Sequence, residues 1–308
     1  MSKISGPALP AQTIPATRSL IGIIYLVTST WALSGLDASG KWLMAMGVSL
    51  AVLSWVRYVV HVLLVCVLVV PVKGVQVFRS TRPKAQLLRG AIMLLATLSF
   101  FTTLNYLPQA EATAINFLAP LIMLALAPWL LREPARISRW LAAGTGFIGV
   151  LIIIRPDAGL HSLGILFGLL TACLFACQYL VTRRVASDDP FTTLIWSGAI
   201  GTFGLSLVLP IALPQAWPVL SEFTPFQWII LLSTGFWGAA GHLLQIQAYR
   251  NAPASMLAPF IYLQIISAAT LGWLVWGQFP DPLTWVGIAI ICGSGITIGL
   301  VEWRSRTH

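Results

Sequence analysis

Polar side chains at helical spacing stand out near the end of the first apolar segment, in the stretch TWALSGLDASGK. They are Thr30, Ser34, Asp37 and Lys41. A helix over residues 20–42 would place all four on one face, because residues three and four apart lie together on a helix. Within a membrane a polar face is costly unless it meets other helices or water, so its ionisable residues predict a functional site. Alternatively, Asp37 and Lys41 form an ion pair at the membrane edge, where lysine side chains extend toward water.

The chain has too few charged residues to cover a soluble surface. Of its 308 residues, 57% are hydrophobic and 9% are charged, and the mean hydropathy of +0.86 predicts an integral membrane protein. The apolar runs are long and continuous, which favours helices over an outer-membrane barrel. A net charge of +9 could indicate nucleic-acid binding, but the basic residues are spread through the gaps between apolar runs. Nucleic acid is therefore not an expected partner.

Ten apolar runs have about the 20 residues that a ~30 Å hydrocarbon core requires. They cover residues 20–42, 48–71, 87–107, 112–131, 138–155, 162–184, 191–210, 226–249, 254–277 and 283–302. The gaps are short and contain Pro, Gly or charge. The predicted fold is an all-α polytopic membrane protein with ten transmembrane helices, a tail over residues 1–18 and a second tail over 304–308.

The basic residues predict the orientation of these helices, because cytoplasmic loops carry the Lys and Arg excess. With the N-terminus inside, fifteen of the eighteen basic residues fall on the cytoplasmic side, and Lys41, Arg57 and Arg155 are the exceptions. We therefore expect a multi-pass protein of the cell inner membrane with both termini in the cytoplasm. Residues 1–17 lack the apolar core of a cleavable signal peptide, so the first helix is expected to act as the targeting signal.

The chain also contains an internal duplication. The matches at an offset of 142 residues, with one at 145, are Gly22 with Gly164, Lys41 with Arg183, AEAT at 110–113 with APAS at 252–255, and Trp140 with Trp285. They define two five-helix repeats, over residues 19–157 and 158–303. Because five is odd, the second repeat must enter the membrane inverted, which is typical of secondary transporters with a binding site at the midplane.

Both halves resemble the EamA-type members of the drug/metabolite transporter superfamily. The segments that carry the resemblance include SWVRYVVHVLL, RGAIMLLATLSFFTTLNYLPQAEATAINFLAPLIMLALAPWLLREP and AYRNAPASMLAPFIYLQ. The matching positions are Arg57, Arg89, Gly90, Tyr106, Leu107, Pro120, Glu133 and Pro259. The second half departs from the acidic position of LREP, with Gly277 and Gln278 instead. The resemblance implies a ten-helix inner-membrane carrier with a central cavity, moving amino acids, vitamins, nucleotide-like metabolites or drugs.

Arg57 is the basic residue placed deepest within an expected span. It lies nine residues into the second run, or ~13 Å along a helix that rises 1.5 Å per residue, so it cannot easily reach the interface. Its charge requires an anion or carbonyl groups, and Asp37 or a substrate carboxylate or phosphate could supply the anion. His61, one turn further on, could carry a proton near neutral pH or serve as a hydrogen-bonded packing residue.

Further polar and aromatic side chains lie within the spans, where each needs a partner. We expect the cavity to be lined by Trp31, Ser34, Arg57, Asn105, Asn116, Gln178, His242, Gln245, Tyr249, Tyr262 and Gln264. Gating or proton coupling is expected from Asp37, Lys41, His61 and Glu111. Hydrogen bonds between helices would explain several of the same residues almost as well.

An enzyme, metal site or cofactor is not expected. The stretch GLDASGKW at residues 35–42 resembles a phosphate-binding loop, but Trp42 replaces the hydroxyl that would hold magnesium and no strand precedes it. The four cysteines, at 66, 173, 177 and 292, lie inside apolar runs and are interpreted as packing residues.

These features predict a secondary active or facilitative transporter of a small polar metabolite, such as an amino acid or vitamin, working by alternating access. Two alternatives stay open: a multidrug or cation efflux carrier of the same fold, and a non-transporting receptor or scaffold. The expected partners are a small-molecule substrate, the lipid bilayer and, in a coupled mechanism, protons. The protein is expected to be a monomer or homodimer.

Overall fold

The computed structural model is helical throughout the part that it describes, which leaves out residues 1–15, 132–136, 156–158, 253–256, 258–259 and 308. Glu133, Ser255 and Pro259, named above from the sequence, lie outside the described residues. The elements are α1 (Ala16–Ala45), α2 (Leu50–Lys73), the 3₁₀ turn η1 (Val75–Phe78), α3 (Pro83–Tyr106), α4 (Gln109–Asn116), α5 (Leu118–Leu131), α6 (Ile137–Ile153), α7 (Ser162–Arg184), α8 (Pro190–Ser206), α9 (Leu209–Ser221), α10 (Pro225–Asn251), α12 (Leu263–Trp276) and α13 (Pro282–Thr307).

The length and apolar character of the helices confirm a polytopic membrane protein. Five described helices are long and apolar enough to cross a bilayer, and a sixth span results if α8 and α9, bent by 81°, are counted together. Local signals set several ends. Ser49 accepts a hydrogen bond from the Val52 N–H at the start of α2, and Gly74, with φ of +70°, follows its end. Thr224 and Gln227 form a capping box at the start of α10.

Two of the expected spans are interrupted in the structure, and proline explains the first of the two interruptions. The run expected at 112–131 is divided at Phe117 into α4 and α5, because Pro120 has no N–H to donate and its ring crowds the carbonyl of Asn116. The run expected at 191–210 ends early: α8 stops at Ser206, and α9 begins at Leu209 with Pro210 in its first turn, where proline is tolerated because that N–H has no partner within the helix. The chain therefore turns between α8 and α9.

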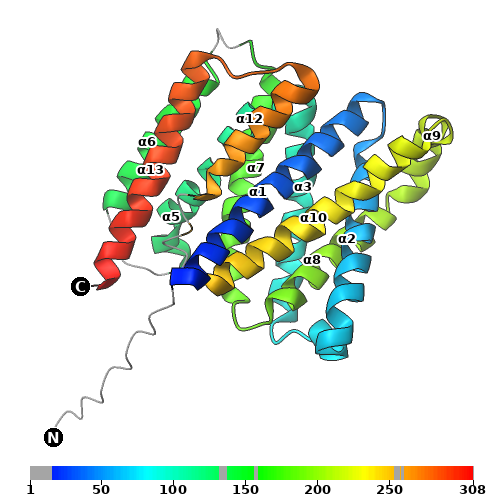
Figure 1. Cartoon of the computed structure of the whole chain (residues 1–308), viewed down its shortest axis with the longest axis horizontal. Coiled ribbons are helices and arrows are strands. Elements are labelled where there is room, and N and C mark those ends of the chain that lie inside the picture. Colours follow the sequence, from blue (N-terminus) through cyan, green and yellow to red (C-terminus); the bar gives the residue numbers. More distant parts are fainter. Residues whose placement is uncertain (1–15, 132–136, 156–158, 253–256, 258–259, 308) are drawn as a thin grey trace, which may run out of the picture.

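The helices form a closed ring, in which each packs against the next. Its order is α1, α10, α2, α8, α3, α7, the α4–α5 pair, α12 and back to α1. Outside the ring, α6 and α13 pack against each other at one edge of the bundle (Figure 1). The start of α1 and the end of α13 lie at the same end of the bundle (Figure 1). We call this the terminal end, and the opposite one the distal end.

Glycines allow the closest helix contacts. At the crossing of α6 and α13, a Cβ at Gly149 would lie 2.8 Å from the Gly287 carbonyl oxygen, and a Cβ at Gly287 would lie 2.6 Å from the Gly149 carbonyl oxygen. Gly241 of α10 faces Leu33 of α1, and its carbonyl accepts a 2.8 Å hydrogen bond from the Ser29 hydroxyl. Small residues at such crossings let backbones approach within a membrane.

Two loops are joined at the terminal end through Asp188. The carboxylate, in the loop between α7 and α8, accepts hydrogen bonds from the hydroxyl of Ser80, from the backbone N–H and hydroxyl of Thr81, and from the side-chain amide of Gln86. Burial alone would raise the pKa of Asp188, but these hydrogen bonds hold it well below its usual range. The next residue, Asp189, caps α8 and forms an ion pair with Lys73. We call Asp188 with its three donor residues, Ser80, Thr81 and Gln86, the latch. The latch ties the α2–α3 loop and the start of α3 to the α7–α8 loop.

We predict that Gly149→Ala lowers the unfolding free energy by about 1–3 kcal/mol, because the new methyl group meets backbone that cannot move cheaply. Gly144→Ala, on the same helix, is the matched control, since a Cβ there meets nothing within 4 Å. The control should be neutral or slightly stabilising, because alanine favours helix over glycine. Thermal unfolding in detergent measures both, and equal effects would contradict the proposed crossing.

We predict that Asp188→Asn destabilises the protein at neutral pH by about 1–3 kcal/mol, because it removes the charged acceptor of four hydrogen bonds, one of them from the buried Gln86 amide. The folded pKa of Asp188 lies below its ordinary value of 3.8. The stabilisation is therefore full above that value and is lost as the pH falls through the folded pKa. The difference in melting temperature between wild type and variant should be constant from pH 7 to about 5 and shrink at lower pH. Glu222→Gln, at an exposed position outside the latch, is the control, and a difference that grows on acidification would contradict the prediction.

Candidate functional site

Arg57 of α2 is enclosed by the ring, as a membrane-embedded guanidinium requires. Arg57 is 7% exposed, and its Nη1 donates a 3.1 Å hydrogen bond to the Thr97 hydroxyl of α3. The guanidinium also lies 5.2 Å from the ring of Tyr58 and 5.7 Å from the ring of Phe101. These neighbours hold the group by cation–π contact and one neutral hydrogen bond, and neither of these interactions neutralises its charge.

Two histidines lie beside Arg57. His61 is one turn further along α2, and its ring centroid is 6.0 Å from that of His242 on α10. A Cβ at Gly238 would lie 3.6 Å from the Arg57 Nε and 3.9 Å from the His61 Nδ1. The absence of a side chain at Gly238 leaves these nitrogens facing α10 at close range. Gln245, one turn after His242, is positioned to hydrogen-bond to it.

Arg89 is a second basic residue inside the bundle, partly buried, and it was not among the residues expected in the site. Its Nε donates a 2.8 Å hydrogen bond to the Thr182 hydroxyl of α7, and its Nη1 donates to the Ser197 hydroxyl of α8. It also acts electrostatically on His242. Its position six residues after Pro83, almost two turns into α3, was the signal that it lies inside the bundle rather than in a loop. We call Arg57, His61, Arg89 and His242 the basic cluster.

One carboxylate lies near the basic cluster in the described part of the chain. The buried acidic residues there are Asp37, Glu111 and Asp188. Asp188 belongs to the latch, and Glu111 lies within electrostatic range of Lys41. Asp37 of α1 is within electrostatic range of Arg57, but it does not approach it within the 4.0 Å of a direct ion pair. The carboxylate in range of Arg57 is therefore one that its guanidinium does not contact.

Lys41 does not pair with Asp37 in this conformation. Its amino group donates a 2.7 Å hydrogen bond to the Leu107 carbonyl and a 3.2 Å bond to the Gln278 side chain, and it lies 5.0 Å from the centre of the Trp276 ring. Lys41 therefore joins α1 to the end of α3 and to the loop that follows α12 at the distal end. A gate formed by Asp37 and Lys41 stays a prediction for another conformation.

Ser34 and Gln264 meet in a helix contact away from the basic cluster. The Ser34 hydroxyl lies 2.6 Å from the Ser267 hydroxyl and 3.4 Å from the Gln264 carbonyl, which joins α1 to α12. The Gln109 side chain of α4 donates a 2.9 Å hydrogen bond to the Ser34 carbonyl. Ser34 is fully buried, so packing between helices accounts for its polar side chain.

The other predicted cavity residues are scattered around the ring. Gln178 is buried and donates to the Met93 sulfur of α3, whereas Asn105 is exposed at the end of α3. Trp31 is 45% exposed and lies on the same outer face of α1 as Leu20 and Ile24. That face is directed away from the basic cluster.

Asn116 and Tyr262 lie at two helix breaks that face each other. Asn116 ends α4, and its side-chain oxygen is buried without a hydrogen-bond partner. Tyr262 precedes α12, and its ring centroid is 4.9 Å from that of Phe117, the residue between α4 and α5. Phe117 and Tyr262 are 145 residues apart, the offset that relates Trp140 to Trp285. The two breaks therefore have the same spacing as one of the residue pairs that indicate the duplication.

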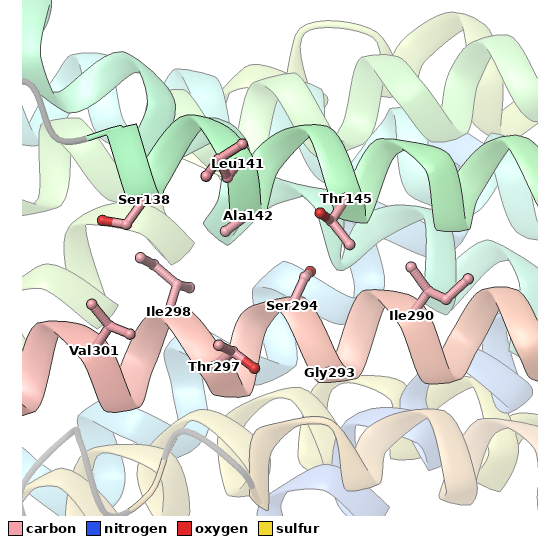
Figure 2. A pocket seen from close by; sticks show the side chains of 10 residues that line it. All are labelled: Ser138, Leu141, Ala142, Thr145, Ile290, Gly293, Ser294, Thr297, Ile298 and Val301. Carbon is pink, nitrogen blue, oxygen red and sulfur yellow. The ribbon is translucent and has the colours of Figure 1, made fainter.

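A groove of about 480 Å³ between α6 and α13 lies outside the ring. Figure 2 shows hydroxyl groups from both helices along it: Ser138, Thr145, Ser294 and Thr297. The residues that line it include no charged side chain, and neither helix belongs to the ring. The groove is therefore separate from the basic cluster, which is the candidate site.

An all-helical membrane bundle that surrounds buried basic and amide side chains is typical of a small-molecule transporter. The chain belongs to the EamA-like transporter family, whose sequence profile matches residues 2–155 and again residues 162–300. This confirms the resemblance seen in the sequence.

Named relatives are transporters rather than enzymes. The S-adenosylmethionine uptake transporter of Rickettsia prowazekii (strain Madrid E) is 27% identical over 234 residues, which cover 76% of this chain and 78% of the relative. The riboflavin transporter of Vibrio cholerae serotype O1 (strain ATCC 39315 / El Tor Inaba N16961) is 30% identical over 201 residues, covering 65% of this chain and 64% of the relative. A solved crystal structure of a protein has the same fold, with a TM-score of 0.65 and 19% identity over 94% of this chain and 98% of the other.

Proposed function

We propose that this protein is a secondary active or facilitative transporter of a small organic anion, moved by alternating access around the basic cluster. Similarity to relatives named for S-adenosylmethionine uptake and riboflavin transport supports a small-metabolite substrate. The particular metabolite is left open by these names, because the relatives differ from one another in what they are named for.

The single observation that supports an anionic substrate is the excess of positive charge inside the ring of helices. Arg57 and Arg89 contribute two positive charges, and Asp37 contributes one negative charge at a distance. A buried charge is costly unless it is paired, and a carboxylate or phosphate is the partner that a guanidinium fork matches best. A substrate anion would complete the basic cluster, and an organic cation would be repelled by it. The anion carrier is therefore favoured over the cation efflux alternative.

The proposed architecture is ten transmembrane helices arranged as two inverted five-helix repeats. The double match of the family profile supports it. The helix neighbours support it too, because exchanging the halves converts α1 with α10 into α7 with α3, and α2 with α10 into α8 with α3. The contact of α5 with α7 likewise becomes that of α12 with α1. Inversion provides two mirror-related states of one bundle, which is the basis of alternating access.

The proposed orientation places the terminal end in the cytoplasm of the cell and the chain in the inner membrane. The Lys and Arg excess supports it, with Lys73, Arg79 and Arg82 near the latch. In this orientation Lys41 and Glu111 lie toward the outer side. We propose that they act there as a gate or proton relay together with Asp37 and His61.

We predict that Arg57→Gln reduces uptake of the transported anion about 10- to 100-fold in proteoliposomes, the effect of removing a hydrogen bond to a charged group. Uptake is measured over a panel of labelled carboxylates and phosphates. Arg57→Lys should retain part of the activity, because it keeps the charge but loses the planar fork. The matched control is Arg79→Gln, at an exposed position. Full uptake by correctly inserted Arg57→Gln would contradict the anion role.

We predict that a single cysteine at Gln245 reacts with a membrane-impermeant thiol reagent from both sides of the membrane, because alternating access exposes the site to each side in turn. The background replaces the four native cysteines by alanine. Leu232→Cys is the control, since Leu232 is half exposed on the outer face of α10 and its thiol would lie in lipid. A Gln245→Cys variant that is unreactive from both sides would favour the receptor or scaffold alternative.

A further inference from the structure

Tyr179 has an exposed side chain on the inward face of α7. The outer face of α7 is marked by Leu166, Leu170, Cys173 and Cys177, all of them exposed. Tyr179 follows Cys177 by two residues, which turns its side chain about 200° from that face. It is nevertheless 38% exposed, so it borders a solvent-accessible space inside the ring rather than the lipid.

Tyr249 repeats this situation on α10. It lies seven residues, or two turns, after His242, which places both on one face of the helix. The outer face of α10 carries exposed Leu232 and Phe236, about 120° away around the helix from Tyr249. Tyr249 is 45% exposed, although its face of α10 otherwise packs into the bundle through Leu231 and Gly238.

The two tyrosines border the same space from different helices. α7 packs against α3 and α10 packs against α1, so the ring separates them. The two phenols are nevertheless within electrostatic range of each other, and Tyr179 is within range of Tyr262 at the helix break. Phe175 stacks on Tyr179 with ring centroids 6.4 Å apart and planes at 25°. This stacking orients the Tyr179 ring, so one aromatic face is fixed toward the space inside the ring of helices.

Exposed aromatic rings inside a bundle offer their faces to a flat partner. Aromatic pairs prefer offset-stacked or edge-to-face arrangements and gain free energy beyond simple area burial. An organic cation would also be drawn to such faces, but the positive charges of Arg57 and Arg89 inside the same ring oppose a cation. A flat, uncharged ring is therefore the favoured partner.

We propose that Tyr179 and Tyr249 form a stacking subsite for the flat conjugated ring of the substrate, whose anionic group binds Arg57. The inference rests on the proposed function and adds the chemical class: an anion joined to an aromatic or heteroaromatic ring. The two turns between His242 and Tyr249 correspond to ~10 Å along α10. A substrate with that separation between anion and ring occupies both ends of the site at once.

The test measures binding of 6-phenylhexanoate and 6-cyclohexylhexanoate to the full chain in lipid nanodiscs, with empty nanodiscs subtracted. The probes share the anion and the spacer and differ in whether the ring is flat. We expect the phenyl probe to bind about three- to tenfold more tightly, within the range of an aromatic pair. Tyr179→Leu and Tyr249→Leu should abolish this preference, and Tyr179→Phe and Tyr249→Phe should keep it. Tyr106→Leu is the control, because Tyr106 stacks on His161 at the distal end.

Three results would overturn the subsite: equal binding of the two probes by wild type, no binding of either probe, or a phenyl preference that survives in the double Leu variant. Arg57→Gln separates this failure from failure of the proposed function. If the variant loses both probes while the tyrosine variants change neither, the anion site stands and the stacking subsite is wrong. If Arg57→Gln still binds both probes, the proposed anion site itself is wrong.

Discussion

The buried positive charge of Arg57 is the constraint on which the rest of the site depends. A guanidinium within a membrane bundle is costly unless polar groups or an anion surround it. The structure supplies the Thr97 hydroxyl and two aromatic rings, with the Asp37 carboxylate further away. Helices α1, α2, α3 and α10 must therefore stay packed around this one side chain. The charge that remains is the basis for the proposed anion site.

The ring of helices makes this arrangement possible because it joins elements far apart in the sequence. Glycines at the α1–α10 crossing let α10 lie against α1, which brings His242 beside His61. At the terminal end, Asp188 accepts hydrogen bonds from the α2–α3 loop and from the first turn of α3 and so ties these segments to the α7–α8 loop. The candidate site thus combines the α2–α3 contacts that hold Arg57 with contacts between segments far apart in the sequence.

The sequence predicted the helical class, the polar stripe of α1 and the depth of Arg57, because these depend on hydropathy and residue spacing within one segment. It did not place Arg89, which was counted with the loop residues that set orientation. Trp31 was expected in the cavity but lies on the outer face of α1, since spacing alone leaves open which side of a helix faces the bundle. Ser34, on the predicted polar face, was found in a contact with Ser267 of α12.

The sequence by itself determined that the chain is a membrane protein of an identifiable transporter family, because apolar length and motif residues are local properties. It also indicated the duplication, through residues that repeat at a nearly constant offset. Only the tertiary structure decided which polar side chains share one space. Pairs such as His61 with His242, or Arg89 with Thr182 and Ser197, are separated by about a hundred residues or more. Their meeting depends on how the two halves pack, and no pattern within a single helix encodes that packing.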